Sequence, residues 1–320
     1  NRCRSLPRDD WKLEFIRNVG SPFVKDFLGT LLQRCQEAEA TTALSEEGAV
    51  VKVASCINAS CYCEHKLLEW SEDVFFLDLR RLQISLADDQ CNSKISGVKV
   101  LQSGESLVSV QGCVFDEELS CLVQFKNEWL QKVVSATLRA FDACCQDYQR
   151  NKKRWQEYKH SLDIVDATVS SSFIDALAIL QLRLRMLGNC LGGVVFVDFW
   201  RGLALVLDQF FLNSVILGGA RFSELGSTQL ACDIHALFQT FRPFCVRPSS
   251  FFPSLCDTVI LLSMRQDDVL QLQQNLSGSS WGFRDQGDED RSGRLKECGL
   301  RCIDTGLAAK ILSVRTFSKT

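Results

Sequence analysis

Four side chains of types that bind metals lie within ten residues of one another, at Cys56, Cys61, Cys63 and His65. Thiolates and imidazoles are the ligands that structural zinc prefers, so this segment is a candidate metal site. Its spacing argues against zinc, because the C-x-C and C-x-H pattern lacks the usual knuckle geometry and no second ligand pair follows. We therefore expect ordinary thiols entering a helix, with no metal and no cofactor, and elemental analysis of the purified chain would decide.

Other residues with catalytic potential are few. The three histidines, His65, His160 and His235, lie outside any nucleophile-elbow or metalloprotease pattern. A small glycine cluster follows a helical pattern and not a strand, so it predicts a helix-to-helix connection and not a phosphate-binding loop; its members are Gly188, Gly192 and Gly193. The sequence therefore indicates no catalytic residues, and we expect a protein that is not an enzyme.

A basic run extends from Arg150 to Arg154, within a segment, 139–160, that holds six basic and three acidic residues. Such a run binds phospholipid headgroups or nucleic acid in some proteins. It is also typical of a solvated face near a helix carboxy terminus, where positive charge stabilises the helix dipole. Both interpretations stay open. Asn58 and Asn275 fit the glycosylation pattern, which carries weight only in a secreted protein.

The distribution of proline and apolar residues predicts long helices. No proline occurs between Pro22 and Pro243, and proline in a helix interior costs roughly 3 kcal/mol. Apolar residues recur at steps of three and four, the period of a helix with one buried face. This pattern predicts helices over residues 22–40, 65–87, 117–155, 162–187, 194–217 and 227–241, a shorter helix ending near 264, and a last one over 305–316.

Two segments break this period. Residues 88–116 are rich in glycine and serine, which predicts a linker. A small hairpin of Val98–Leu101 and Leu107–Val110 and a disordered insertion are equally compatible with that composition. Residues 277–293 are rich in Gly, Ser, Asp and Arg and predict a mobile loop.

The composition indicates a folded protein without a strong overall charge. The hydrophobic content is 46%, enough for a substantial core, and the net charge of −3 gives no global attraction to nucleic acid or anionic membranes. Sixteen cysteines are spread over the chain, and we expect most of them to be buried as small apolar side chains. Residues 194–217 are the most apolar stretch, but Asp198, Arg201 and Asp208 interrupt it, so we expect a buried bundle helix and not a transmembrane span.

Several residue groups add a family resemblance to this helical pattern. The sequence resembles the RINT/TIP family, and the plant members especially, over about 117–275 and more moderately over 303–317. The residues that carry it are Phe125–Trp129, Arg139–Asp142, Asp147–Tyr148, Asn151–Trp155, Phe199–Trp200 through Asp208, Phe210–Phe211, Ala220–Ser223 with Gly226, Gln229–Leu230, Arg247–Pro248, Phe251–Phe252 and Ile260–Leu262.

The resemblance implies an all-α protein, an elongated stack of antiparallel helical bundles of the CATCHR type. It implies a subunit of the endoplasmic-reticulum tethering complex, called Dsl or NRZ, that captures COPI-coated vesicles returning from the Golgi. The implied partners are a Zeste-White tether subunit, mainly through an amino-terminal region outside this chain, and ER SNAREs. The implied location is the cytoplasmic face of the ER membrane, as a peripheral protein without a small-molecule substrate or nucleic-acid partner.

The same reasoning predicts the order of domains. Because the chain starts without an initiator methionine, we expect it to be the carboxy-terminal part of a longer protein. The expected parts are a partial upstream bundle over 1–91, an irregular linker or insertion over 92–116, a carboxy-terminal bundle over 117–275, a mobile loop over 276–302 and a terminal helix over 303–320.

Overall fold

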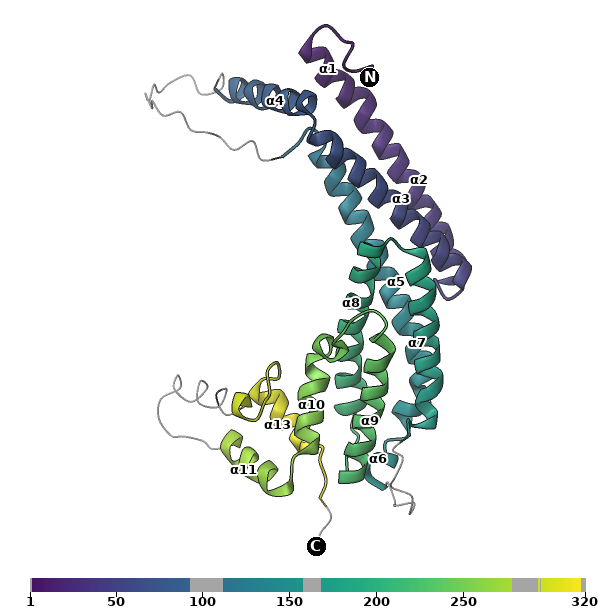
Figure 1. Cartoon of the computed structure of the whole chain (residues 1–320), viewed down its shortest axis with the longest axis vertical. Coiled ribbons are helices and arrows are strands. Elements are labelled where there is room, and N and C mark those ends of the chain that lie inside the picture. The colour runs from purple at the N-terminus through teal and green to yellow at the C-terminus, as the bar shows by residue number, and fades with distance from the viewer. Residues whose placement is uncertain (1, 93–111, 158–167, 278–292, 294, 318–320) are drawn as a thin grey trace, which may run out of the picture. The chain divides into compact units, whose positions relative to one another are not determined.

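The computed structural model describes residues 2–92, 112–157, 168–277, 293 and 295–317 (Figure 1). In these ranges the regular structure is helical, with one isolated bridge between Phe222 and Arg315. The chain divides into two compact units, one of residues 1–133 with 190–192 and one of residues 134–189 with 193–320. We describe each unit by itself, and the domain boundaries expected from the sequence stay a prediction.

The first unit begins with a helix that is longer than the sequence predicts. α1 (Asp9–Phe15) continues through a π-helical turn (Ile16–Gly20) into α2 (Ser21–Thr42). Pro22 therefore does not start a separate helix. The amide of Ser21 donates to the carbonyl of Ile16, five residues back, and this wider turn accommodates the proline, which has no amide hydrogen to donate.

α3 (Glu47–Ser71) and α4 (Val74–Asn92) replace the single predicted helix over 65–87. The predicted start was wrong because the helix continues back to Glu47, with Gly48 tolerated in its first turn. The predicted continuity was wrong because the chain breaks at Asp73, between α3 and α4. The Asp73 carboxylate accepts the amide of Phe75 at 2.9 Å, which caps the start of α4. α2 and α3 lie side by side (Figure 1) and are joined by a turn in which Ala43 and Leu44 have positive φ.

The core of the first unit includes a cluster to which α4 and the start of α5 (Asp116–Arg150) contribute. Its buried members are Ile16, Val24, Leu67, Leu79, Phe115 and Leu122. Ion pairs join α5 to its neighbours, from Lys126 to Glu64 at 3.2 Å and from Lys132 to Glu39 at 2.8 Å. The 35 residues of α5 confirm a long helix from the predicted start near 117, but it ends at Arg150 and not at 155, because residues 151–153 leave the helix.

The second unit packs the later part of α5 with α7 (Ser171–Cys190), α8 (Gly193–Phe210) and α9 (Glu224–Phe241). A π-helical stretch (Phe211–Ile216) extends α8, and Gly219 ends it with φ of 91°. These bounds confirm the helices expected over 194–217 and 227–241. α7 starts at Ser171, so the prediction of a helix over 162–187 was wrong at Val169, which lies before the helix. Residues 158–167 lie outside the described residues.

Shorter elements complete the second unit: α6 (Arg154–Glu157), a 3₁₀ turn (Pro248–Phe251), α10 (Pro253–Ser263), α11 (Gln266–Ser277) and α13 (Thr305–Ser313). α10 is the short helix expected before 264, whereas α11 was not predicted. α13 ends before the predicted position 316 because Thr316 donates to the Phe222 carbonyl at 2.8 Å, in extended pairing.

Buried aromatic rings form the centre of the second unit. Phe141 of α5 contacts Phe173 of α7 with ring centroids 6.1 Å apart and Phe211 at 6.0 Å. Tyr148 lies between Phe173, at 4.7 Å, and Trp155, at 5.3 Å. All five side chains are almost fully buried, so rings from four consecutive segments fix how these helices pack.

Candidate functional site

A groove of about 700 Å³ lies between α2 and α3 in the first unit. α3 presents small or polar residues along it, and α2 presents a row at helical spacing. The residues that line it include Leu31, Arg34, Glu37, Ala38 and Thr41 of α2, and Gly48, Ala49, Lys52, Ser55, Cys56 and Ala59 of α3. Small side chains leave room for the backbone of another segment to approach closely.

The charged groups of this groove are exposed, and one of them, the Glu37 carboxylate, accepts a hydrogen bond from the Gln33 side chain at 2.9 Å. Arg34 and Lys52 supply two cations, and Glu37 and Glu46 supply two carboxylates, all on exposed side chains. No ion pair joins any of the four within the described part of the chain. A surface with both signs of charge around small residues is suited to a polar helix.

The four candidate metal ligands point to different surroundings on α3. Cys56 is buried against Cys35 of α2, and burial is the main reason that the pKa of the Cys35 thiol is strongly raised. Cys63 packs against the apolar cluster of the first unit, and His65 is exposed. Within the described residues no three His, Cys, Asp or Glu side chains converge as metal ligands would.

The cysteines are less buried than the sequence analysis expected. The fifteen cysteines of the described ranges are free thiols, and only Cys35, Cys56 and Cys145 among them are fully buried. Ten of the others are half-buried, six on helices and four in turns or loops. The expectation that most are buried was therefore wrong, because a small side chain at the margin of a helix face or in a loop is only partly covered.

The other singled-out residues have structural surroundings. His235 is exposed on α9, its Nε2 3.0 Å from the side-chain nitrogen of Gln239. Gly192 lies between the end of α7 and the start of α8, which confirms the predicted helix-to-helix connection, and Gly188 lies against the Phe196 ring. The Asn58 amide donates to the Cys190 carbonyl at 2.7 Å and its oxygen accepts from Gly192 at 2.9 Å, so this side chain holds a turn. His160 and the side chain of Asn275 lie outside the described residues.

The basic run does not form one solvated helix face. Arg150 ends α5, and Lys152 and Lys153 are exposed in the turn that follows. Arg154 instead turns inward, with its guanidinium carbon 4.1 Å from the ring centres of both Tyr148 and Trp155. The run therefore contributes a packing residue as well as surface charge.

Asp233 is the centre of a buried polar network that the sequence analysis missed. Its carboxylate accepts the Tyr148 hydroxyl at 2.9 Å, the Ser170 amide at 2.8 Å and the Ser170 hydroxyl at 2.7 Å. The Gln229 amide donates to it at 3.1 Å. Burial and the neighbouring carboxylate raise the pKa of Tyr148 well above its usual value. These donors occupy the acceptor sites of the carboxylate, so it offers no free base. The same hydrogen bonds join α5, α9 and the residue that precedes α7.

Two more buried carboxylates bind backbone amides. Asp208 of α8 accepts the amides of Ser254 and Leu255 at 3.2 and 2.9 Å, at the start of α10. Asp257 of α10 uses one oxygen to accept three successive amides, those of Arg301, Cys302 and Ile303, at 3.0, 2.7 and 3.0 Å. These contacts tie the last part of the chain to α10.

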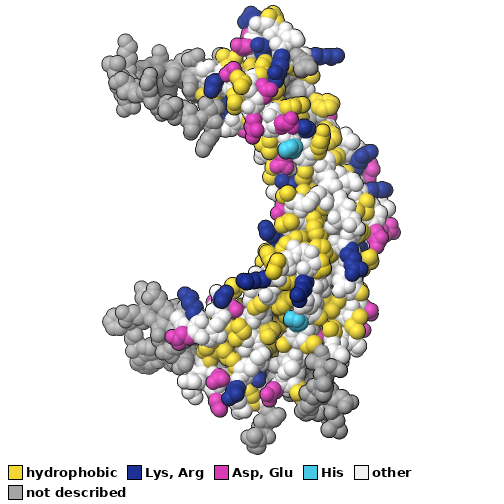
Figure 2. Space-filling view, viewed as in Figure 1, with side chains coloured by type: hydrophobic (Ala, Val, Ile, Leu, Met, Phe, Trp, Pro, Cys, Tyr) yellow, Lys and Arg dark blue, Asp and Glu magenta, His cyan; other side chains and the backbone are white. Residues whose placement is uncertain are grey.

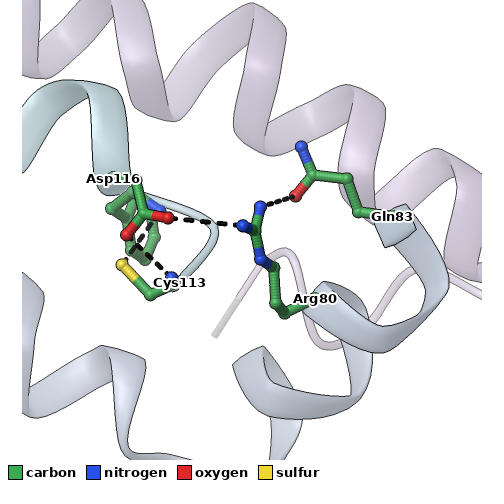
Figure 3. A network of polar contacts seen from close by, with 5 residues as sticks. Arg80, Gln83, Cys113 and Asp116 are labelled. Atoms are coloured by element: carbon green, nitrogen blue, oxygen red, sulfur yellow. Dashed lines mark hydrogen bonds and ion pairs between the residues drawn. The ribbon is translucent and has the colours of Figure 1, made fainter. Parts of the chain in front are cut away.

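A surface network orders the start of α5 (Figure 3). The Asp116 carboxylate accepts the Cys113 amide at 2.7 Å and the Arg80 guanidinium at 3.4 Å, and Arg80 also donates to Gln83 at 3.3 Å. Burial is the main cause that raises the pKa of the Cys113 thiol to about 11. The thiol is thus protonated at neutral pH, which is unlike a nucleophilic cysteine.

The described side chains define a helical protein whose polar clusters order its own backbone. None of these clusters within the described ranges sets a nucleophile against a base and an oxyanion donor. No helix of the described residues is both long and apolar enough to cross a membrane. The class is therefore a helical protein with a surface groove.

The chain belongs to the RINT-1/TIP-1 family, whose sequence pattern matches residues 1–315. It is similar to RINT1-like protein MAG2 of Arabidopsis thaliana, with 34% identity over 318 residues. This match covers 99% of the chain and 36% of the relative, so the chain spans about a third of that protein's length. The family that the residue groups of the carboxy-terminal half indicated is thus confirmed.

The fold has a match among solved structures. The Dsl1 complex subunit Tip20, crystallised with the SNARE Sec20, aligns with a TM-score of 0.57 at 16% identity. The alignment covers 83% of this chain and 42% of that one. It confirms the expected all-α fold.

Proposed function

We propose that this chain is a non-enzymatic scaffold subunit of an ER-associated tethering complex. In this role it helps to capture Golgi-derived COPI vesicles for retrograde transport to the ER. The observation that carries the proposal is the family match over residues 1–315, supported by a fold shared with a tether subunit. Long helices supply a stiff body and broad surfaces, which a tether needs.

The proposed partners are other Dsl/NRZ subunits and ER SNAREs. The solved relative Tip20 was crystallised with the SNARE Sec20, which supports a SNARE as one partner here. Contact with a Zeste-White subunit would depend mainly on an amino-terminal region outside these residues. The proposed location is the cytoplasmic face of the ER membrane, where the chain is held peripherally through its partners.

We place the SNARE contact, as part of this proposal, at the groove between α2 and α3. A helical segment of a SNARE with both signs of charge would match Arg34 and Lys52 on one hand and Glu37 and Glu46 on the other. Its backbone would approach the small residues of α3, and helix-in-groove binding of this kind is a recurring mode of recognition.

The test is a pull-down of the purified chain with ER SNAREs and tether subunits, followed by two groove variants. Ser55→Trp fills the groove and Lys52→Glu reverses one of its charges, and both side chains are exposed. Each should weaken SNARE capture by about tenfold or more. Gln36→Trp is the matched control, because Gln36 is exposed on α2 but does not line the groove.

The outcomes separate the proposal from its details. Failure of every SNARE and tether subunit to bind would contradict the tethering role. Binding that survives both groove variants would leave the role standing and remove the groove as the site. Equal loss with Gln36→Trp would point to a general disturbance of α2, which circular dichroism of each variant detects.

A further inference from the structure

The connection between α9 and α10, residues 242–252, combines positive charge with a protruding apolar side chain. From Ile234 to Cys256 the sequence contains no Asp or Glu, whereas Arg242 and Arg247 lie in the connection. Between these arginines Val246 is 95% exposed, the highest exposure among the large hydrophobic side chains described. A single exposed valine is common at protein surfaces, so what distinguishes this loop is the combination of the valine with an arginine on either side of it.

Aromatic contacts hold the connection on both sides of Val246. Phe244 packs edge-on against Phe196 of α8, with ring centroids 5.1 Å apart, and Phe251 packs edge-on against Trp200 at 4.7 Å. Pro243 and Pro248 restrict the backbone on either side. The exposed valine is therefore presented by an anchored loop.

A third arginine lies beside the same connection. The guanidinium of Arg201 on α8 is 5.7 Å from the ring centre of Phe251 and 5.6 Å from that of Trp200. Arg242 donates to the side chain of Gln239 at 3.4 Å, a neutral partner. No ion pair involves any of these three arginines in the ranges described.

The surrounding charge stays positive. Asp198, which is exposed one turn before Arg201 on α8, offsets one of the three cations. Figure 2 shows Lys and Arg side chains gathered on this face, in the area where Figure 1 draws the connection between α9 and α10. The connection, with Arg201, Arg242, Arg247 and Val246, is named here the arginine loop.

We infer that the arginine loop contacts an anionic membrane surface directly. Anionic headgroups complement the arginines, and the valine side chain enters the boundary between headgroups and acyl chains. A peptide ligand is less well matched, since a side chain that is 95% exposed protrudes from the surface and does not line a groove. This contact goes beyond the proposed function, in which partner subunits alone hold the chain at the membrane.

The expected contact is weak and depends on salt. Each basic side chain near an anionic surface strengthens binding by about fivefold, and the attraction falls off within a Debye length. Three arginines partly offset by one aspartate would give roughly a 25-fold preference for anionic over neutral vesicles. Such an affinity would assist a protein that other subunits already hold near the membrane.

The test is co-sedimentation of the whole chain with phosphatidylcholine vesicles, with or without phosphatidylserine. We expect binding to the phosphatidylserine vesicles that decreases as salt is added. The double variant Arg242→Gln and Arg247→Gln should lose about 25-fold in affinity. Val246→Asp should reduce binding by at least tenfold, because it places a carboxylate at the point of contact.

A matched control removes the same amount of charge elsewhere in the second unit. Lys152→Gln with Lys153→Gln neutralises two exposed cations of the basic run and should leave vesicle binding unchanged. Binding lost with this control and kept with the arginine variants would overturn the inference and favour the basic run. Equal binding to both kinds of vesicle, or binding to soluble polyglutamate and not to vesicles, would overturn it as well. Neither result bears on capture of SNAREs, so the proposed function is tested separately.

Discussion

The hydroxyl of Tyr148 on α5 donates a hydrogen bond of 2.9 Å to the carboxylate of Asp233 on α9, and both side chains are fully buried. The two residues are 85 positions apart in the sequence. Their contact joins the end of the longest described helix to the middle of α9, and Ser170, the residue before α7, donates to the same carboxylate.

Removing the shared acceptor, Asp233, should lower the free energy of unfolding more than removing one donor, the Tyr148 hydroxyl. Tyr148→Phe deletes one hydrogen bond and should lower the free energy of unfolding by about 1 kcal/mol. Asp233→Ala leaves several buried donors unsatisfied and should cost about 3 kcal/mol. Urea unfolding followed by tryptophan fluorescence measures both. Tyr62→Phe, at an exposed position, serves as the control and should have no effect, and equal costs for the two core variants would contradict this account.

Gly226 marks a close approach between backbones. A Cβ atom built on it would lie 1.9 Å from the carbonyl oxygen of Trp155. That carbonyl accepts the amide and the hydroxyl of Ser223, the residue that caps α9, so it has little freedom to move. Gly226→Ala should therefore destabilise the protein by about 2 kcal/mol or more, measured by the shift of the urea midpoint.

Gly29 on α2 provides the opposite case. Nothing lies within 4 Å of a Cβ atom at this position. Gly29→Ala should stabilise the protein by about 0.5 to 1 kcal/mol, because alanine loses less backbone entropy in a helix. If both glycine variants shift the urea midpoint in the same direction, the close approach at Gly226 does not determine the effect of its substitution on stability.

Asp208 predicts a specific dependence of stability on pH. Burial raises the pKa of its carboxyl above the usual 3.8, despite the backbone amides that it accepts. The folded protein thus holds this proton more tightly than the unfolded chain does. The resulting stabilisation is complete below the unfolded pKa and is lost as the pH rises through the folded pKa.

In the variant Asp208→Asn the side chain at this position is neutral at every pH, so the variant lacks this pH-dependent stabilisation. Its free energy of unfolding relative to the parent should therefore improve as the pH rises from acidic to neutral, whatever the constant cost of the substitution. Urea titrations of both proteins across that range measure the difference. A difference that does not change with pH would contradict the raised pKa.

Two adjacent cysteines on α5 should react at very different rates. Cys144 is exposed, whereas Cys145 is buried and its burial raises the pKa of its thiol to about 12. The thiolate is the reactive form, so iodoacetamide should label Cys144 in the native protein and Cys145 only after unfolding. Peptide mapping by mass spectrometry, with Cys144→Ser as control, measures this. Native labelling of Cys145 at a rate similar to that of Cys144 would contradict the packing of this helix.

The long helices could be predicted from the sequence because their period repeats many times. In α5 and α8 the apolar residues recur over several turns without a proline, so local pattern and burial agree. α11 was missed because Gln266–Ser277 is mostly polar and buries only a narrow stripe that includes Val269 and Leu272. The break at Asp73 was missed because a single capping carboxylate has little effect on an apolar pattern.

The buried networks could not be predicted because their partners are distant in the sequence. Asp233 binds Ser170 across 63 positions, and Asp257 binds Cys302 across 45. A lone aspartate on an apolar helix face does not indicate which amide it will meet. Many residues of the family resemblance, by contrast, are core residues such as Trp129, Phe141, Tyr148 and Trp155, which explains why the pattern identifies a fold and not a catalytic site.

The backbone amides of residues 301–303 all donate to a single atom, the Oδ2 of Asp257. An acceptor shared by three amides cannot release one of them by a rotation of its side chain without releasing the others. In hydrogen–deuterium exchange these three amides should therefore become exposed together, in one opening event with a common rate. The segment would come away as a single cooperative unit and not by gradual fraying from one end.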